Sequence, residues 1–289
     1  MAAVGVDHYE NFPVASVLCP PRLRPAIVAI YRFARTADDI ADEGPLKADE
    51  RLQQLAQYRH DLAALFEGRP RSGRWETVFV PLAAARERHA LPWQPLDDLL
   101  DAFMQDTGNP LYANRAQLLD YCRRSANPVG RLLLHLSGVD DAVSLQQSDD
   151  ICSALQLINF WQDISVDLPN GRCYVPMDDA QRHGLHPATL TQPDLAPQVD
   201  RLVAELCAWA RQLMLRGAPL ARRIPGRAGW ELRLVVAGGL RILDKIQAMR
   251  YGSARRRPTL GKADAAALLW LALSPLRLPD TPSDQKAAP

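Results

Sequence analysis

Apolar residues recur at helical spacing along nearly the whole of this 289-residue chain, whereas runs of alternating β-branched residues are nearly absent. Within residues 23–42, for example, Ile27, Ile30 and Ala34 lie on one stripe, and the pattern stops near Gly44. Proline, glycine or asparagine bounds each periodic segment, as helix punctuation requires. The sequence therefore predicts an all-α protein.

About ten helices follow from this periodicity. We expect them at Leu23–Asp42, Asp49–Phe66, Thr77–Ala90, Gln94–Gln105, Arg115–Arg124, Val129–Leu136, Asp149–Asp167, Pro197–Arg216, Gly229–Tyr251 and Lys262–Leu273. The segments 155–166 and 232–246 are apolar around most of their circumference, so we expect both to be central. No repeat or long linker divides the chain, which predicts one domain over residues 1–278 and a disordered tail over 279–289.

Composition narrows the range of functions. The formal net charge of +1 gives no global field that would favour nucleic acid or an anionic membrane as the main partner. The five cysteines are scattered and form no CxxC pair, so we expect reduced thiols in a cytoplasmic protein. The N-terminal residues do not resemble a signal peptide, and no apolar run is long enough to span a bilayer. A P-loop and a GxGxxG turn after a strand are both absent from the sequence, so nucleotide binding has no motif behind it.

Two short acidic stretches carry the strongest chemical signal. Asp38 and Asp42 lie four residues apart, and Asn159, Asp163 and Asp167 follow the same spacing in a second stretch. On a helix, side chains at this spacing share one face, where like charges repel. A divalent cation relieves that repulsion, and Mg²⁺ favours one or two carboxylates together with phosphate oxygens and water. Two such helices facing each other would bind a diphosphate through bridging metal ions.

Each of these features also has a plainer interpretation. Asp38 and its neighbours fit a solvated patch at a helix end, although acidic groups there oppose the helix dipole. The second stretch fits this interpretation less well, because carboxylates close to a mostly buried helix are costly unless paired or metal-bound. Arg35 and Arg172 are either phosphate ligands or ordinary ion-pair and loop arginines. The basic run 255–257 is either solvated or closes a site over an anion.

A helix break lies between the two acidic stretches. Asn127 and Pro128 interrupt the helical pattern of residues 121–130, and Gly130 follows closely. Small residues at this point allow a bulky ligand to approach the backbone, and a simple kink explains the pattern equally well.

The order and spacing of these motifs resemble the trans-isoprenoid head-to-head synthases, the family of squalene and phytoene synthases. The first aspartate-rich motif of that family is similar to Tyr31, Arg35, Asp38, Asp39 and Asp42 in this chain. The second is similar to Gln156, Asn159, Asp163 and Asp167, followed by Arg172, Tyr174 and Pro176. The segment 121–130 resembles the helix break that lines the prenyl channel of the family. The resemblance runs from about His8 to Arg256 and implies an isoprenoid synthase fold, with helices around a central apolar channel.

Details of the sequence resemble one bacterial branch, the hydroxysqualene synthases of hopanoid biosynthesis. The resemblance rests on the segments 10–16 and 159–163. Three positions depart from the usual family pattern: Asn11 lies in place of a serine-rich entry, Gln162 replaces an arginine, and Gly239 or Leu240 replaces a tyrosine. Without the arginine at 162, one fewer cation is available to balance a second diphosphate.

The resemblance implies an enzyme of isoprenoid and squalene biosynthesis that ionises presqualene diphosphate with Mg²⁺. Rearrangement and capture by water would then give hydroxysqualene and release diphosphate, the reaction of a carbon–oxygen lyase acting on phosphates. Two or three Mg²⁺ ions would be held by Asp38, Asp42, Asn159, Asp163 and Asp167. The four aspartates among these residues are the catalytic candidates. No NADPH is expected to take part. The implied substrate-binding residues are Tyr31, Arg35, Gln156, Asn159, Arg172, Tyr174, Arg256, Asn11 and Gln162.

Three alternatives remain open from the sequence. One is a condensing enzyme that joins two prenyl diphosphates head to head. Another is a non-catalytic assembly factor on the same fold, whose aspartates would be eroded, and the third is a helical scaffold with fortuitous acidic faces. A C30 product is poorly soluble in water, so we also expect peripheral contact with the inner membrane near residues 268–278, and no nucleic acid partner.

Overall fold

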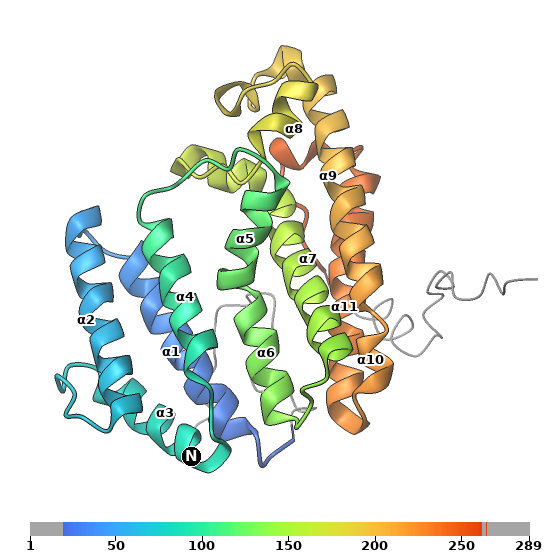
Figure 1. Cartoon of the computed structure of the whole chain (residues 1–289). Helices are drawn as coiled ribbons and strands as arrows, with labels where there is room; N and C mark the ends of the chain where they lie inside the picture. The colour runs from blue at the N-terminus through green and yellow to red at the C-terminus, as the bar shows by residue number, and fades with distance from the viewer. Residues whose placement is uncertain (1–19, 262–263, 265–289) are drawn as a thin grey trace, which may run out of the picture.

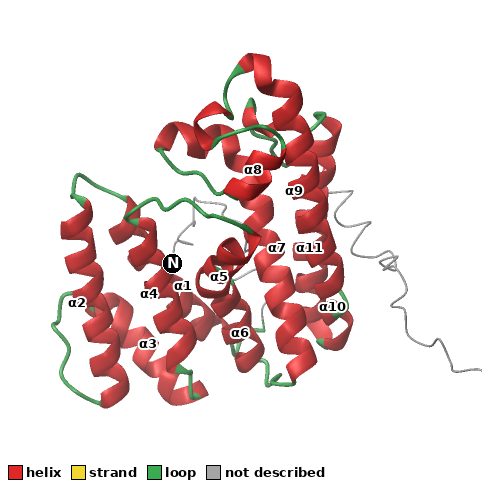
Figure 2. Ribbon diagram, turned by 45° about the horizontal axis from the view of Figure 1, so that its top comes forward, coloured by secondary structure: helices red, strands yellow, loops and turns green. Residues whose placement is uncertain are grey.

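The computed structural model describes residues 20–261 and Asp264. Within these residues the regular structure is entirely helical (Figures 1 and 2). The α-helices are α1 (Arg24–Asp42), α2 (Ala48–Glu67), α3 (Glu76–His89), α4 (Trp93–Asp106), α5 (Arg115–Ser125), α6 (Asn127–Leu136), α7 (Ala142–Asp167), α8 (Met177–Arg182), α9 (Ala196–Gly217), α10 (Leu220–Arg223) and α11 (Gly226–Ala248). Short 3-10 turns are η1 (Leu168–Asn170), η2 (Pro187–Thr189), η3 (Pro193–Leu195) and η4 (Gly252–Ala254). The predicted all-α fold class is confirmed.

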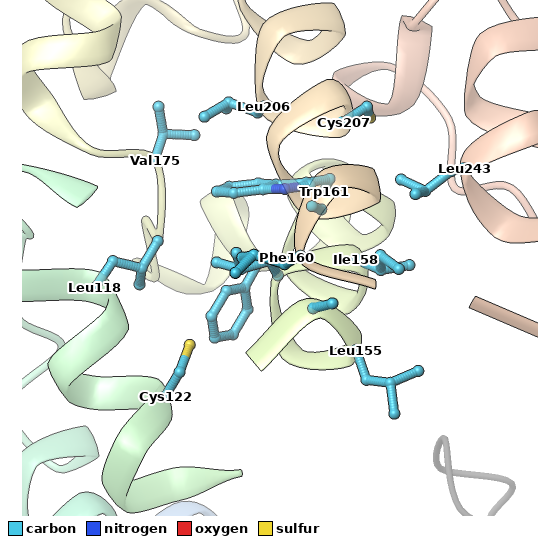
Figure 3. Close-up of a cluster of buried hydrophobic side chains, with 14 of the residues drawn as sticks. Leu118, Cys122, Leu155, Ile158, Phe160, Trp161, Val175, Leu206, Cys207 and Leu243 are labelled. Atoms are coloured by element: carbon cyan, nitrogen blue, oxygen red, sulfur yellow. The ribbon is translucent and has the colours of Figure 1, made fainter. Parts of the chain in front are cut away.

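Two groups of buried apolar side chains hold the helices together. One lies among α1, α2, α3 and α4, where the rings of Phe33 and Tyr58 stack with their centroids 5.2 Å apart. The other surrounds α7 and encloses Trp161 completely (Figure 3). α6 contributes to both groups, Leu132 to the first and Leu134 to the second. The buried apolar surface of this one helix therefore joins the two halves of the molecule.

α7 is buried around most of its circumference, as the sequence predicts for residues 155–166. α11 packs against α7 and α9 but is less enclosed. Val236 and Ile246 are buried in it, whereas Leu232 and Val235 remain partly exposed. The predicted central position of residues 232–246 therefore holds for one face of α11 only.

Most predicted helices occur close to their expected bounds, and the differences have local causes. α7 begins well before the predicted Asp149 because the Asp141 side chain caps it, accepting a hydrogen bond of 3.0 Å from the Ser144 amide. α8 was not predicted, since a helix this short contains too little periodicity to detect. Apart from Asp264, the predicted helix 262–273, the domain limit at 278 and the tail 279–289 lie outside the described residues. In the described part of the chain, no helix has both the length and the apolar character needed to cross a membrane.

The break predicted within residues 121–130 occurs between α5 and α6, at Ala126. Beyond it, α6 packs so closely on α7 that a Cβ added to Gly130 would lie 2.6 Å from the Sγ of Cys152. The small residue therefore serves close helix packing here.

Candidate active site

The C-terminal turns of α1 and α7 meet, although they are far apart in the sequence. Asp38 and Asp42 lie near the end of α1, and Asp163 and Asp167 lie near the end of α7. Arg172 joins the two ends: its backbone amide donates to the Asp167 carbonyl over 3.0 Å, and its Nη2 lies 2.7 Å from Oδ2 of Asp42. The ends of the two acidic stretches therefore lie next to each other.

The electrostatic behaviour of Asp167 shows how close these charges are. Burial raises the pKa of Asp167 to about 6, with a further increase from the neighbouring charges of Asp163 and Asp42. The guanidinium groups of Arg172 and Arg257 act in the opposite direction. Several carboxylates that lie close together and are partly shielded from water form a site suited to bind a cation.

Asp106, the last residue of α4, also belongs to this site and was not predicted. The hydroxyl of Tyr121 donates to Oδ2 of Asp106 over 2.8 Å. Burial raises the pKa of Asp106 to about 7; the Tyr121 hydrogen bond and Arg172 lower it, whereas Asp42 and Asp38 raise it. Asp106 has no second carboxylate three or four residues away, so it forms no motif in the sequence. The one available signal was its place at the C-terminal end of a helix, where the helix dipole disfavours a negative charge.

Aromatic rings line the site beside the carboxylates. Tyr174 stacks on Phe160 with the ring centroids 3.7 Å apart and the planes 5° from parallel. The rings of Tyr112 and Tyr121 lie within 6.1 Å of Tyr174, measured between centroids. A small cavity is lined by Phe160, Tyr174, Asp167 and Arg172, among other residues. Ring faces next to fixed charges create a site that is apolar on one side and ionic on the other.

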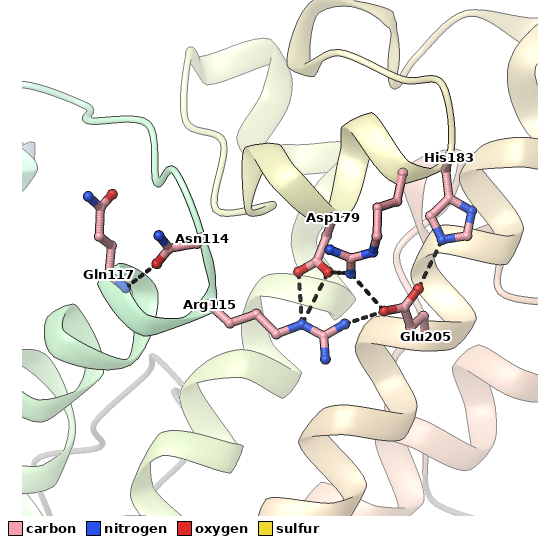
Figure 4. A network of polar contacts seen from close by, with 7 residues as sticks. Asn114, Arg115, Gln117, Asp179, His183 and Glu205 are labelled. Atoms are coloured by element: carbon pink, nitrogen blue, oxygen red, sulfur yellow. Dashed lines mark hydrogen bonds and ion pairs between the residues drawn. The ribbon is translucent and has the colours of Figure 1, made fainter.

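An ion-pair network around the buried Asp179 holds this aromatic wall in place (Figure 4). The Tyr112 carbonyl accepts a hydrogen bond of 2.9 Å from the Met177 amide at the start of α8. Arg115, three residues after Tyr112, has its Nε 2.9 Å from Oδ2 of Asp179, whose side chain is fully buried. Glu205 on α9 binds Arg115 as well. The loop that carries Tyr112 is thereby attached to α8 and α9.

Arginines pair with several of the carboxylates. Nη1 of Arg35 lies 3.1 Å from Oδ2 of Asp38. Arg257, which was not among the predicted site residues, forms an ion pair with Asp163. The predicted Arg256 is exposed to solvent on the same segment.

The remaining predicted residues follow the same helix faces. Tyr31 lies on the stripe of α1 that carries Arg35 and Asp38, while Gln156 and Asn159 lie on the stripe of α7 that carries Asp163. All of these side chains are partly exposed. Asn11 lies outside the described residues.

Gln162 differs from the others, because its side chain is buried and its Nε2 donates to the Pro258 carbonyl over 2.8 Å. A substrate-binding role for this amide was predicted. In the structure, an N–H group of this amide donates to the backbone of the chain itself.

Whether the residues fit Mg²⁺ depends on how many protein ligands the ion needs. No three histidine, cysteine, aspartate or glutamate side chains among residues 20–261 and Asp264 are grouped closely enough to hold a metal ion by themselves. A Mg²⁺ ion bridged to a diphosphate requires only one or two carboxylates, since phosphate oxygens and water complete its octahedron. The hard oxygen donors on α1 and α7 fit that requirement.

Comparison with known proteins places this architecture in a family. The model of the squalene/phytoene synthase family matches residues 6–264. A hydroxysqualene synthase of Sinorhizobium fredii is 36% identical over 241 residues, which cover 83% of this chain and 79% of that protein. A presqualene diphosphate synthase of Zymomonas mobilis is 30% identical over 94% of this chain and 91% of its own.

Solved structures agree with the sequence comparisons. The crystal structure of squalene synthase HpnC from Alicyclobacillus acidocaldarius superposes with a TM-score of 0.77 at 34% identity, covering 85% of this chain and 90% of that one. A dehydrosqualene synthase gives the same TM-score at 22% identity, which supports the fold. The facing ends of α1 and α7, the helical architecture and these matches lead to one conclusion: the chain belongs to the squalene/phytoene synthase family.

Proposed function

We propose that this protein is a hydroxysqualene synthase, which ionises presqualene diphosphate, rearranges the resulting cation and captures it with water. The products are hydroxysqualene and diphosphate, so the enzyme would be a carbon–oxygen lyase acting on phosphates in hopanoid biosynthesis. The observation that carries the proposal is the meeting of the α1 and α7 carboxylates at Arg172, beside an aromatic wall. The match to a hydroxysqualene synthase at 36% identity supports this particular reaction.

The charged residues would act on the leaving group. Two or three Mg²⁺ ions would be held by Asp38, Asp42, Asn159, Asp163 and Asp167; when bound, they would supply Lewis-acid stabilisation of the departing diphosphate. Arg35 and Arg172 would contact the phosphate oxygens, because a guanidinium presents paired donors to them. Both arginines already lie against the carboxylates that would hold the metal. Cleavage of the carbon–oxygen bond would leave its electron pair on the diphosphate.

The aromatic residues would act on the cation. Tyr174 lines the cavity and is only partly buried, so the face of its ring that Phe160 does not cover would attract positive charge through the ring quadrupole. The apolar channel that the resemblance implies would exclude bulk water, so that the allylic cation would survive until one positioned water adds to it. That water forms the new carbon–oxygen bond and releases one proton.

Product analysis tests this reaction directly. The purified protein is incubated with presqualene diphosphate, Mg²⁺ and H₂¹⁸O, without NADPH, and the product is analysed by mass spectrometry. We expect hydroxysqualene that carries one ¹⁸O atom. A hydrocarbon product, or no conversion of presqualene diphosphate, would refute the assignment.

A second candidate is a condensing enzyme that joins two prenyl diphosphates. It is favoured by the 30% identity to a presqualene diphosphate synthase over nearly the whole chain. Incubation with farnesyl diphosphate alone distinguishes the two activities, because only the condensing enzyme consumes it. For either activity we propose a cytoplasmic enzyme with peripheral contact to the inner membrane.

A further inference from the structure

The segment 255–258 folds back from the end of α11 onto α9 and α7, and it makes three side-chain contacts there. Arg255 pairs with Asp200 of α9, its Nη1 lying 2.8 Å from Oδ1. Arg257 forms an ion pair with Asp163 of α7. The carbonyl of Pro258 accepts the hydrogen bond from Gln162 over 2.8 Å. Two consecutive residues of α7 therefore bind two consecutive residues of this segment.

Gln162 is the buried member of this set. Its side chain is only 7% exposed, whereas Arg257 lies at the surface. A buried amide donor and a buried carbonyl each cost free energy unless they are hydrogen-bonded, and here they bond to each other. The Gln162 contact therefore determines where the backbone of residue 258 lies, while the exposed ion pair contributes less to that placement.

The position of this segment places the positive charge of Arg257 beside the carboxylates of α7. Its guanidinium lies close enough to Asp163 and Asp167 to act on both carboxylates. Arg172 acts on Asp167 too, from the loop that follows α7. The site therefore has one cation supplied by this loop and another supplied by the segment after α11.

We propose that Gln162 is a positioning residue: by binding the Pro258 carbonyl it holds Arg257 at the carboxylate site, where the guanidinium contacts the phosphate groups of the substrate. This inference rests on the proposed function in one respect, namely that the site binds a diphosphate. It assigns no substrate contact to Gln162 itself.

The test measures the binding of inorganic pyrophosphate, in the presence of Mg²⁺, by titration calorimetry on the full-length protein. Gln162→Met keeps the side-chain length and removes the donor. Because charge-assisted hydrogen bonds are the strong ones, we expect Gln162→Met and Arg257→Gln each to weaken pyrophosphate binding about tenfold. If Gln162 acts through Arg257, the double variant is no weaker than Arg257→Gln alone.

Matched controls separate this effect from general damage to α7. Gln146→Met changes an exposed residue of the same helix. Arg216→Gln removes the partner of Asp150, an ion pair elsewhere on α7. Both controls should bind pyrophosphate as the unaltered protein does. Urea unfolding of each variant shows whether the protein remains folded.

Each outcome decides the matter. Unchanged pyrophosphate affinity in Gln162→Met overturns the inference, and so does a tenfold effect that persists in the Arg257→Gln background. An unaltered protein that does not bind pyrophosphate overturns both this inference and the proposed function. In a further outcome, the variants weaken pyrophosphate binding as expected, with no further loss in the double variant, while the unaltered protein leaves presqualene diphosphate unconverted. That combination upholds the inference and refutes only the proposed reaction.

Discussion

Asp106 illustrates, at the scale of single residues, how a carboxyl group changes character when the fold encloses it. It lies at the end of α4, receives the Tyr121 hydroxyl and experiences the charges of Asp42 and Asp38. Its pKa of about 7 lies above that of an exposed aspartate. The folded protein therefore holds a proton on Asp106 at pH values where the unfolded chain has lost it.

This raised pKa gives a stability prediction with a definite sign. Between about pH 4 and pH 7 the folded state binds more protons at Asp106 than the unfolded state, so this residue makes the free energy of unfolding decrease as pH rises. Asp106→Asn removes that dependence. We compare the free energies of unfolding of the variant and the unaltered protein, measured with urea and without Mg²⁺. As pH rises from about 5 to about 8, we expect this difference to move in favour of the variant by about 1–3 kcal/mol.

The exposed Asp140 provides the control, because Asp140→Asn should leave the pH dependence of unfolding as it is. An Asp106→Asn variant whose stability follows the same pH profile as the unaltered protein would show that the carboxyl is already ionised at pH 5.

Sequence reasoning worked well at this scale where residues repeat and poorly where they stand alone. Spacing placed Asp38 and Asp42 on one face, and Asp163 and Asp167 on another. It could not reveal that Asp106 joins them, since that depends on how α4 packs. Burial likewise decided the orientation of Gln162, which no local pattern encodes.

At the scale of helices, close approach depends on glycines whose missing side chains leave room for a neighbour. Gly217 ends α9 against α7, and a Cβ there would lie 2.6 Å from Cγ1 and 2.9 Å from the backbone nitrogen of Ile151. Gly238 of α11 has nothing within 4 Å of such a Cβ. The same substitution should therefore have opposite effects at the two positions.

We expect Gly217→Ala to destabilise the protein by about 1–3 kcal/mol, because the backbone of α7 cannot move aside cheaply. Gly238→Ala should stabilise it by up to about 1 kcal/mol, since alanine restricts the unfolded chain and favours the helix. Chemical unfolding of both variants measures the difference. Equal effects at the two positions would mean that α7 and α9 are not packed as closely as the structure shows.

The helix pattern itself was predictable, because apolar periodicity and Pro or Gly boundaries are local properties. The start of α7 and the existence of α8 were not predicted. The first depends on a cap and the second on tertiary contacts, since Asp179 of α8 is buried against Arg115 of α5. Propensity alone does not supply such contacts.

For the whole molecule, the decisive feature is that the proposed diphosphate site draws its carboxylates from two separately packed halves. Asp42 belongs to α1, within the first apolar group, and Asp167 belongs to α7, within the second. Among the described contacts, the ion pair between Arg172 and Asp42 joins the two acidic helix ends directly. A ligand that bridges them would stabilise the arrangement of the halves.

This arrangement predicts that Mg²⁺ and pyrophosphate stabilise the protein together far more than either does alone. A ligand at about a hundred times its dissociation constant adds roughly 2.7 kcal/mol, which corresponds to a rise in Tm of about 4–5 °C for a chain of this size. We expect that rise in calorimetric scans only when both are present, because each carboxylate stripe alone repels pyrophosphate and holds Mg²⁺ weakly. Asp167→Asn should abolish most of the joint effect, and the exposed Asp140→Asn should keep it. If Mg²⁺ alone produced the full rise, or if Asp167→Asn retained it, the two helix ends would not act as one diphosphate site.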